Sequence, residues 1–412
     1  MVKTNNRAKG KNVRQQIDFL HKADNGDFLL SDNVFVGGNV LRAQRGWTLF
    51  NDKAHYTRFY GSYTTGIVAS IGTNLVYIDV FGKILVYNFS QPAEPFASVT
   101  HRDKIFGTIK SLSTLLMYNG NSYPFWSVKA TSYAVLGERL FGINEATLYF
   151  SEISENFSDH TLNNIKLPSR CTALAAIDNC LYILGSKCYK LIPSADGTEM
   201  KYTQIYDGLQ DVLADTVTVI GSKIVFATEN GMYCMTDGKV KRIFKNLVNI
   251  VDLKTMYCRG LDNYCVAYCY PKGGGAKKAV MLDIENESVA GVLSDVYDIT
   301  YFRGKMLAVC SDGTIKSLAE TYADNVKFVK SGIDFSILGK KHLRKLVVKT
   351  ATPIDVYITA DNVTRLYKVN GKKGVQSLPI AGTGERFNVT VRATGETKTD
   401  FLELVAETYG EG

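Results

Sequence analysis

A short pattern of apolar and polar positions recurs along most of the chain. An apolar residue is followed by three residues rich in Gly, Asp, Asn, Ser or Lys, and an apolar strand starts four positions after the first residue, as in "IDNCLYI" at 177–183. The apolar residues that open the copies, called anchors below, are Ile71, Leu112, Leu136, Ile177, Ile220, Leu261 and Phe302. They are 41, 24, 41, 43, 41 and 41 residues apart, which indicates an internal repeat of nearly constant length.

Each copy of the pattern predicts a tight hairpin, in which the anchor ends an inner strand and the next strand leads outward. Further turn signals inside the repeats, such as "ENG" at 229–231 and "DG" at 237–238, raise the expected content to about four strands per repeat. Such a sheet cannot bury both faces alone, but radial stacking buries them between neighbours, and about 40–45 residues is the period of β-propeller blades. No run between 60 and 330 has the period of a helix.

The number of blades follows less directly from the pattern. Seven anchors predict seven blades, whereas the 24-residue interval predicts a truncated or irregular blade near Leu112. The pattern therefore allows either six or seven blades. The segment "LLSDNVFVGGNVLRAQRGW" at 29–47 has strand character and an anchor-like residue at Leu30. We expect it to complete the last blade, because closing the ring between the chain ends removes a free sheet edge.

After about residue 330 the period stops and a second series of short strands begins. Segments such as "KKHLRKLVVKT" (340–350) and "FLELVAETY" (401–409) read as strands, and "NGKKG" at 370–374 reads as a hairpin turn. In "RFNVTVRA" a half-buried antiparallel strand is indicated by the alternation of Phe387, Val389 and Val391 with Asn388, Thr390 and Arg392. The predicted fold class is therefore all-β: a six- or seven-bladed β-propeller followed by a small C-terminal β-sandwich. The predicted domains are a basic N-terminal arm (1–27), the propeller (28–330) and the sandwich (331–412).

Composition narrows the class of protein. Hydrophobic residues make up 45% of the chain, and 24 Tyr and 20 Phe favour strands over helices. All eight cysteines lie between Cys171 and Cys310 without metal-ligand spacing, so we interpret them as small buried hydrophobes in a reducing compartment. No apolar run is long enough to span a membrane, and the first 16 residues do not read as a signal peptide. These features predict assembly in a cytoplasm.

The search for catalytic chemistry yields little. "SDGT" at 311–314 resembles a fragment of the Asp-box turns of sialidase-like enzymes, but it occurs once and is explained as a hairpin turn. No carboxylate pair for glycoside hydrolysis can be singled out, and the five His are isolated. "KGGGAKK" at 272–278 lacks the order of a phosphate loop and reads as a flexible blade loop with a weak indication of phosphate contact. We predict no catalytic residue, no metal, no cofactor and no enzymatic activity.

Two basic stretches are the candidates for contact with other molecules. The N-terminal arm carries Lys3, Arg7, Lys9, Lys11 and Arg14 without an acidic residue. It is either a solvated, disordered tail or an arm that contacts a neighbouring subunit or the phosphates of nucleic acid without sequence specificity. The second stretch contains Lys340, Lys341, Arg344, Lys345 and Lys349, which we expect on the solvent face of a sandwich strand. The net charge of +8 permits an anionic partner without requiring one.

Several segments resemble a known family. "LGERLFGINEATLYFSEISENFSDH" (136–160) is similar to a blade of the virion propellers of tailed bacteriophages, and "DNVFVGGNVLRAQRGW" (32–47) resembles the start of those proteins. The C-terminal strands "LRKLVVKT", "DVYITADN" and "RFNVTVRATGE" are similar to the β-domain that follows the propeller in them. The family includes packaged-DNA stabilisation and tail-nozzle proteins of the neck and tail, and it offers no catalytic residues.

The resemblance implies a structural protein of a virion, assembled in the cytoplasm of a bacterial host. It implies a ring-shaped homo-oligomer that helps to hold the packaged genome or conduct it during ejection. Its partners would be portal, adaptor or tail proteins and, through non-specific contact, double-stranded DNA. One alternative is a host-glycan-binding propeller, such as a receptor-binding tail protein or a lectin. Its candidate aromatic platforms are Tyr77, Tyr118, Tyr182, Tyr233 and Tyr268, which the pattern places inside strands as packing residues. A polysaccharide-acting hydrolase is a further alternative.

Overall fold

The structure, a computed structural model, describes residues 11–19, 21–22, 26–37, 39–72, 74–87, 95–101, 103–109, 114–118, 121–152, 161–194 and 199–408. The chain divides into two compact units. The propeller unit comprises Trp47–Glu287 and Asp295–Leu318. The terminal unit comprises the described residues up to Gly46, the segment Ser288–Ser294 and the described residues from Ala319 onward.

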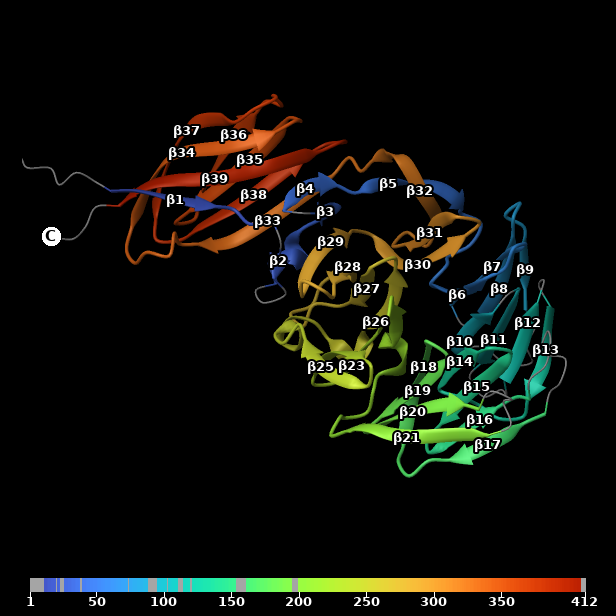
Figure 1. Cartoon of the computed structure of the whole chain (residues 1–412). Helices are drawn as coiled ribbons and strands as arrows, with labels where there is room; N and C mark the ends of the chain where they lie inside the picture. Colours follow the sequence, from blue (N-terminus) through green and yellow to red (C-terminus); the bar gives the residue numbers. More distant parts are fainter. Residues whose placement is uncertain are drawn as a thin grey trace, which may run out of the picture. The chain divides into compact units, whose positions relative to one another are not determined.

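The described strands of the propeller unit form seven antiparallel sheets around a central axis (Figure 1). The first two sheets contain β6 (Arg58–Ser62), β7 (Gly66–Ile71), β8 (Asn74–Asp79) and β9 (Ile84–Val86), then β10 (Pro95–His101), β11 (Lys104–Ile109), β12 (Thr114–Tyr118) and β13 (Asn121–Trp126). The third and fourth contain β14 (Ser132–Leu136), β15 (Arg139–Asn144), β16 (Thr147–Phe150) and β17 (Asn163–Lys166), then β18 (Cys171–Ile177), β19 (Cys180–Gly185), β20 (Lys187–Pro193) and β21 (Met200–Asp207).

The remaining sheets complete the wheel. The fifth contains β22 (Thr218–Ile220), β23 (Lys223–Thr228), β24 (Gly231–Thr236) and β25 (Lys239–Ile243), and the sixth has β26 (Tyr257–Leu261), β27 (Tyr264–Cys269) and β28 (Lys278–Asp283) within this unit. The seventh contains β30 (Val296–Phe302), β31 (Lys305–Cys310), β32 (Ile315–Tyr322) and β5 (Arg45–Asn51). The helical segments of the unit are short: α1 (Leu247–Ile250), η3 (Ala214–Thr216) and η4 (Leu253–Thr255).

Apolar side chains between successive sheets form the core of the propeller unit. Ile143 of the third sheet and Ile183 of the fourth belong to one fully buried cluster. Ile78 of the first sheet and Val309 of the seventh belong to another, which joins the two ends of the wheel. Burial of each such side chain contributes about 1.5–3 kcal/mol. The sheets therefore bury their faces against their neighbours, and the expectation of a β-propeller is confirmed.

At five of the seven anchors the predicted hairpin follows the inner strand of a sheet. Leu136, Ile177, Ile220, Leu261 and Phe302 each end the first strand of a sheet and are followed by a tight turn. In "IDNC" the turn residues Asp178 and Asn179 both have positive φ, 49° and 57°, which is the geometry of the two-residue turns that match the twist of a hairpin. Asp and Asn suit these positions because they tolerate the left-handed region.

The first two sheets depart from the prediction. Ile71 ends the second strand of its sheet rather than the first, and Leu112 lies outside the described residues, between β11 and β12. The first strands end at Ser62 and His101, which are polar. The second sheet nevertheless has four strands, so the expectation of a truncated blade near Leu112 is wrong. The short interval arose because the anchor pattern marked a second hairpin in these two sheets and a first hairpin in the others.

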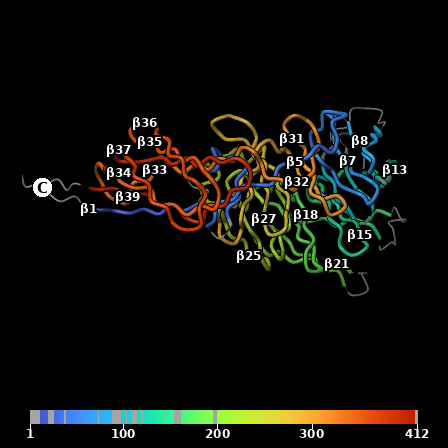
Figure 2. Tube along the Cα trace, turned by 90° about the horizontal axis from the view of Figure 1, so that it is seen from above, coloured from blue at the N-terminus to red at the C-terminus, as the bar shows by residue number. Residues whose placement is uncertain are grey.

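The wheel is closed by a strand from the N-terminal part of the chain. β5 lies beside β32 as the outermost strand of the seventh sheet (Figures 1 and 2), and the Ser317 hydroxyl donates to the Thr48 carbonyl across this pair, with Oγ 3.4 Å from the oxygen. The closing strand is thus Arg45–Asn51 and not 29–47 as a whole. Leu30, the expected anchor, lies in the short helix η1 (Asp27–Leu30) of the terminal unit.

The terminal unit contains two packed sheets. One has the order β33 (Val326–Ile333), β38 (Phe387–Ala393), β35 (Ile354–Ala360) and β36 (Val363–Val369). The other includes β3 (Val34–Gly37), β4 (Val40–Ala43), β39 (Lys398–Thr408), β34 (Lys341–Thr350) and β37 (Gln376–Gly384), and β1 (Lys11–Gln16) also pairs with β39. β29 (Ser288–Leu293) pairs with β3 and with β2 (His21–Lys22).

Alternation along the strands builds the core of the terminal unit. Phe387, Val389 and Val391 are each at most 1% exposed, while the residues between them point to the other face, as predicted. The turn at "NGKKG" was predicted wrongly: it connects β36 to β37, which lie in different sheets, and is not a hairpin. The hairpin lies just before it, where Asp361 and Asn362 have positive φ.

The boundaries of the predicted domains also shift. The sandwich begins before residue 331, because β33 is one of its strands, and it takes in strands that the sequence assigned to the arm and to the propeller. β1 in particular runs antiparallel to β39 with Lys11 opposite Thr408 (Figures 1 and 2). Local patterns do not encode such a pairing between the two ends of the chain. Among the helices that the structure describes, none has the length and apolar character to cross a membrane.

Candidate functional site

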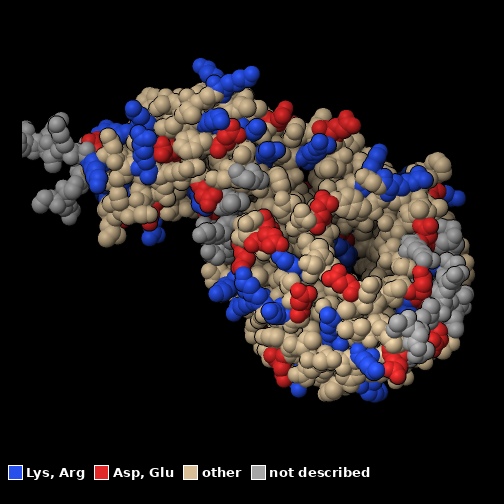
Figure 3. Space-filling model, in the orientation of Figure 1, with Lys and Arg blue, Asp and Glu red and all other residues tan. Residues whose placement is uncertain are grey.

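The propeller unit is hollow along its axis. Three neighbouring hollows share Tyr60 as a lining residue, and two of them have volumes of about 370 and 750 Å³. Their walls come mainly from the first strands of the sheets, which lie innermost. Figure 3 shows the opening in the middle of the wheel, with Lys or Arg side chains visible inside it. We therefore treat this channel as the candidate functional site.

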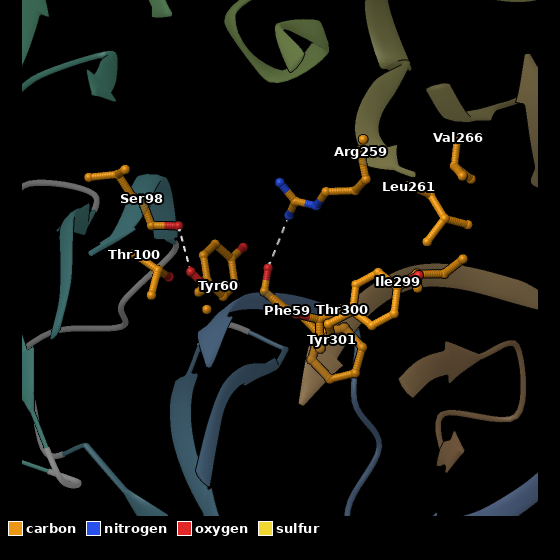
Figure 4. Close-up of a pocket in the computed structure, with 13 residues that line it drawn as sticks. Phe59, Tyr60, Ser98, Thr100, Arg259, Leu261, Val266, Ile299, Thr300 and Tyr301 are labelled. Carbon is orange, nitrogen blue, oxygen red and sulfur yellow. Dashed lines mark hydrogen bonds between the residues drawn. The ribbon is translucent and has the colours of Figure 1, made fainter. Parts of the chain in front are cut away.

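A buried carboxylate organises one wall of the channel. Asp298 on β30 is 0% exposed and accepts hydrogen bonds from the backbone N–H groups of Phe59 and Ile299, with N···O distances of 2.8 and 2.9 Å. The Arg259 Nε atom lies 3.4 Å from the same carboxylate. The Arg259 guanidinium also donates to the Phe59 carbonyl at 3.2 Å (Figure 4). Three sheets, the sixth, seventh and first, are thereby joined at one point.

An ion pair crosses the channel. Arg58 begins β6 in the first sheet, and both of its terminal nitrogens donate to the carboxylate of Asp215, in η3 before the fifth sheet, at 3.3 and 3.2 Å. Burial alone would lower the pKa of Arg58, but Asp215, together with Tyr60 and Asp298, more than offsets this and raises the pKa above its ordinary value. Because the two residues come from sheets that are not adjacent, the ion pair spans the channel.

Tyrosine rings line the channel beside these charges. Tyr257 stacks on Tyr268 with centroids 4.5 Å apart and planes at 14°. The Arg58 guanidinium carbon lies 4.5 Å from the centroid of Tyr257, and the Lys277 ammonium lies 4.1 Å from it. Cations at such distances from a ring face are attracted by its quadrupole. Burial raises the pKa of Tyr257 well above its ordinary value, so its hydroxyl stays protonated.

Smaller hydrogen bonds join neighbouring sheets elsewhere along the channel. The Ser98 hydroxyl donates to the Tyr60 carbonyl at 2.9 Å, between the second and first sheets (Figure 4). The Thr131 hydroxyl donates to the Thr172 carbonyl at 3.0 Å, between the third and fourth. These contacts fix the inner strands to one another. Chemically, the channel offers four cations, two carboxylates and several tyrosine faces.

The predicted N-terminal contact residues are only partly described. Lys3, Arg7 and Lys9 lie outside the described residues. Lys11 and Arg14 are exposed on β1, and because side chains alternate along a strand, their odd spacing places them on opposite faces. Arg14 lies 3.9 Å from Glu403. Residues 11–16 are therefore an ordered strand rather than a solvated tail, and these two cations do not form one patch.

The second basic stretch departs from the expectation at one residue. Lys341 is 1% exposed, and its ammonium donates to the Glu385 carbonyl at 2.8 Å. A β-bulge after Leu343 shifts the register, so that Arg344 and Lys345 both reach solvent. Arg344 forms an ion pair with Glu407. The stretch is therefore mostly an ordinary strand surface, as expected, but not a continuous cationic face.

Other candidates find structural explanations. Tyr77, Tyr182 and Tyr268 are at most 5% exposed, which confirms their packing role and removes them as glycan platforms. All eight cysteines are buried and free, as interpreted from the sequence. "SDGT" forms the turn between β31 and β32, where Asp312 accepts hydrogen bonds from both the backbone N–H and the hydroxyl of Thr314. Across the described ranges, no three His, Cys, Asp or Glu side chains gather as a metal site requires.

The residues of the channel site were mostly missed by the sequence analysis. Arg58, Asp215, Arg259 and Asp298 are scattered over about 240 positions and meet only when the wheel closes. Lys277 is different, because it belongs to "KGGGAKK", which the analysis singled out for its weak indication of phosphate contact. A signal was available for Arg259 and Asp298, because each lies on a first strand that an anchor ends. Arg58 lies on a first strand without an anchor, and Asp215 lies in η3, so neither carried this signal.

Comparisons with known proteins return only solved structures of low similarity to this chain. No protein-family model matches the sequence, and no curated protein matches it. A solved structure of the computationally designed Ika8 protein is 14% identical, with a TM-score of 0.42, 66% of this chain covered and 98% of that one. A structure of YCF48 bound to D1 peptide is 10% identical, with a TM-score of 0.43 and coverage of 66% and 95%. A chain of the mitotic checkpoint complex is 8% identical, with a TM-score of 0.45 and coverage of 70% and 97%. Likeness at this level extends to the fold at most.

Proposed function

We propose that this protein is a structural component of the virion of a tailed bacteriophage. It forms a homo-oligomeric ring at the neck or tail and helps to hold or conduct the packaged genome. It is assembled in the cytoplasm of the bacterial host and contacts portal, adaptor or tail proteins. The resemblance of its blade, start and C-terminal strands to such proteins supports the proposal.

The observation that carries the proposal is the pairing of strands from the N-terminal part of the chain with strands from its C-terminal part. β5 closes the propeller unit against β32, and β1 pairs with β39 across nearly the whole chain. Each unit is thus completed by strands far apart in sequence, and opening either one requires loss of long-range pairing. We expect such closure to make unfolding slow. Slow unfolding is what a protein of a long-lived particle requires.

The closed channel bears on the mechanism. Since the ion pair of Arg58 and Asp215 crosses the propeller unit, a DNA duplex does not run along this axis. In the proposed ring, the genome passes between subunits. Any contact with DNA is through phosphates and without sequence specificity, for which the N-terminal basic residues remain the candidates.

The oligomeric state of the full chain tests this proposal. We expect light scattering after size-exclusion chromatography to give a mass that is an integer multiple of 45.6 kDa, and negative-stain images to show rings with a central hole. A protein that stays monomeric at every concentration tested, and that is retarded on a glycan column, would contradict the ring and support the alternative of a glycan-binding propeller.

A further inference from the structure

One cation of the channel forms no ion pair within the part of the chain that the structure describes. Lys277 lies in the connection between β27 and β28, and its ammonium faces the rings of Tyr257, Tyr297 and Tyr268, with centroids at 4.1, 5.6 and 5.9 Å. No carboxylate among the described residues forms an ion pair with it. The nearby carboxylates are already engaged, Asp215 by Arg58 and Asp298 by Arg259.

Lys277 lines the largest of the three hollows. This hollow, the upper cavity, has a volume of about 750 Å³, within the range of small-ligand sites. Its lining includes the side chains of Arg58, Tyr60, Thr57, Thr131 and Lys254. The cross-channel pair of Arg58 and Asp215 bounds it on one side, since both residues also line the adjoining hollow. The ion pair therefore lies between this cavity and the adjoining hollow.

A second group in the upper cavity also lacks a partner. Tyr257 is 6% exposed, and its hydroxyl is buried without a hydrogen-bond partner in the described part of the chain. A buried polar group that makes no hydrogen bond costs stability, and such groups usually mark a missing ligand or water. The hydroxyl stays protonated, but its oxygen is closed off from solvent, so Tyr257 contributes its ring rather than its hydroxyl to the wall of the cavity.

We propose that the upper cavity binds a small anion carrying a phosphate or carboxylate group, held by Lys277 and Arg58 beside the ring of Tyr257. The site supplies positive charge and aromatic walls, and its unpaired cation is compensated only when an anion enters. Its size favours a small molecule over a polymer. The inference does not depend on the proposed role in a virion.

Binding of two probe anions tests the proposal. Calorimetric titration of the full chain with inorganic phosphate and with citrate, at constant ionic strength set with sodium chloride, separates the two kinds of oxyanion. We expect at least one of them to bind. Lys277→Gln should weaken that anion by about tenfold or more, because it removes a charge-assisted hydrogen bond. The matched control is Lys272→Gln on the exposed part of the same connection, and its affinity should stay at the wild-type value.

A second measurement covers the case in which Lys277→Gln alters the fold. Lys277→Arg keeps the charge and should retain most of the affinity. In the wild-type protein, the lysine side-chain NMR signal that Lys277→Gln removes should titrate at higher pH when the anion is present. The charged groups that face Lys277 are Arg58, Arg259 and Asp298. Cys269 and the three tyrosines face it as well. Absence of binding by both anions, equal binding by Lys277→Gln, or an unmoved titration would each overturn the proposal.

Discussion

At the scale of single residues, a few buried charges hold the inner strands together. Asp298 accepts two backbone N–H groups and lies beside Arg259, so one carboxylate serves three sheets. Such groups are costly to bury and tolerable only when fully paired. The main role of the paired charges of the channel is therefore structural. Lys277 is the exception, because it is half-buried and forms no ion pair with a carboxylate of the described chain.

Replacement of Asp298 by Asn tests the structural part of this account. Asp298→Asn leaves Arg259 without its counter-ion and turns one hydrogen-bond acceptor into a donor. We expect the free energy of unfolding to fall by about 3–5 kcal/mol. Denaturant titration measures it, with Asp262→Asn, at an exposed turn residue, as the control that should change it by less than about 0.5 kcal/mol. A loss as small as that of the control would contradict the role of Asp298.

Lys277 gives the pH dependence a definite sign. Burial lowers the pKa of Lys277 from 10.5 to about 8. Below about pH 8 both states carry the proton, and burial of the charge costs stability. Between about pH 8 and 10.5 the unfolded state holds more of this proton than the folded state, so the free energy of unfolding rises with pH over this window.

Comparison with Lys277→Gln isolates this effect. In a buffer without phosphate or carboxylate, the stability of the wild type should increase relative to that of Lys277→Gln as the pH is raised from about 8 to about 10. Denaturant titration at several pH values measures the difference. Parallel pH profiles would show that the ammonium is not buried as described.

At the scale of elements, the hydrogen bonds of Asn51 at the end of β5, called the clasp below, connect the seventh sheet to the first. Asn51 is 4% exposed; its amide donates to the Gly82 carbonyl of the first sheet at 3.1 Å, and its oxygen accepts from the Tyr56 hydroxyl at 2.7 Å. The same oxygen accepts the backbone N–H of Lys53 at 3.0 Å. Asn51 thus ties the closing strand to the turn after β8.

Loss of this clasp should loosen the closure of the wheel. We expect Asn51→Ala to lower the free energy of unfolding by about 2–3 kcal/mol, because it removes the acceptor of the buried Tyr56 hydroxyl and of the Lys53 backbone N–H. Amide hydrogen exchange in β5 and β32 should become faster while that in β19 does not change. Asn263→Ala, at an exposed turn position, is the control. Unchanged exchange in β5 would contradict the clasp.

The basic residues near the N-terminus are the candidates for contact with DNA. If the arm contacts phosphates, replacing Lys3, Arg7, Lys9, Lys11 and Arg14 by Gln should weaken binding to mixed-sequence duplexes uniformly and flatten the salt dependence. Fluorescence anisotropy at several salt concentrations measures both. The control variant removes the same number of charges from exposed lysines of the propeller unit: Lys201, Lys239, Lys245, Lys272 and Lys305. An equal loss in both variants would show that only net charge matters.

Elements also show how far the sequence could lead. The repeated anchors at Leu136, Ile177 and Phe302 predicted inner hairpins because the apolar end of a first strand and its polar turn are local signals. The pattern missed the first hairpins of the first two sheets, because their inner strands end in Ser62 and His101, which are polar. The pairing of β1 with β39, and the meeting of the channel charges, depend on closure over long distances, which local periodicity does not record.

At the scale of the whole molecule, the account rests on closure. The chain forms a seven-sheet propeller unit and a two-sheet terminal unit, and each is completed by an N-terminal strand. This closure underlies the rigidity that we assign to a virion part, the recess that we assign to a small anion, and the exclusion of a DNA duplex from the propeller axis.

An experimental density map of the purified protein tests this closure most directly. The account predicts seven blades, with residues 45–51 as the outermost strand beside 315–322, and residues 11–16 paired with 403–408. A map with six blades, or one in which the last blade takes its outer strand from the C-terminal part of the chain, would contradict it.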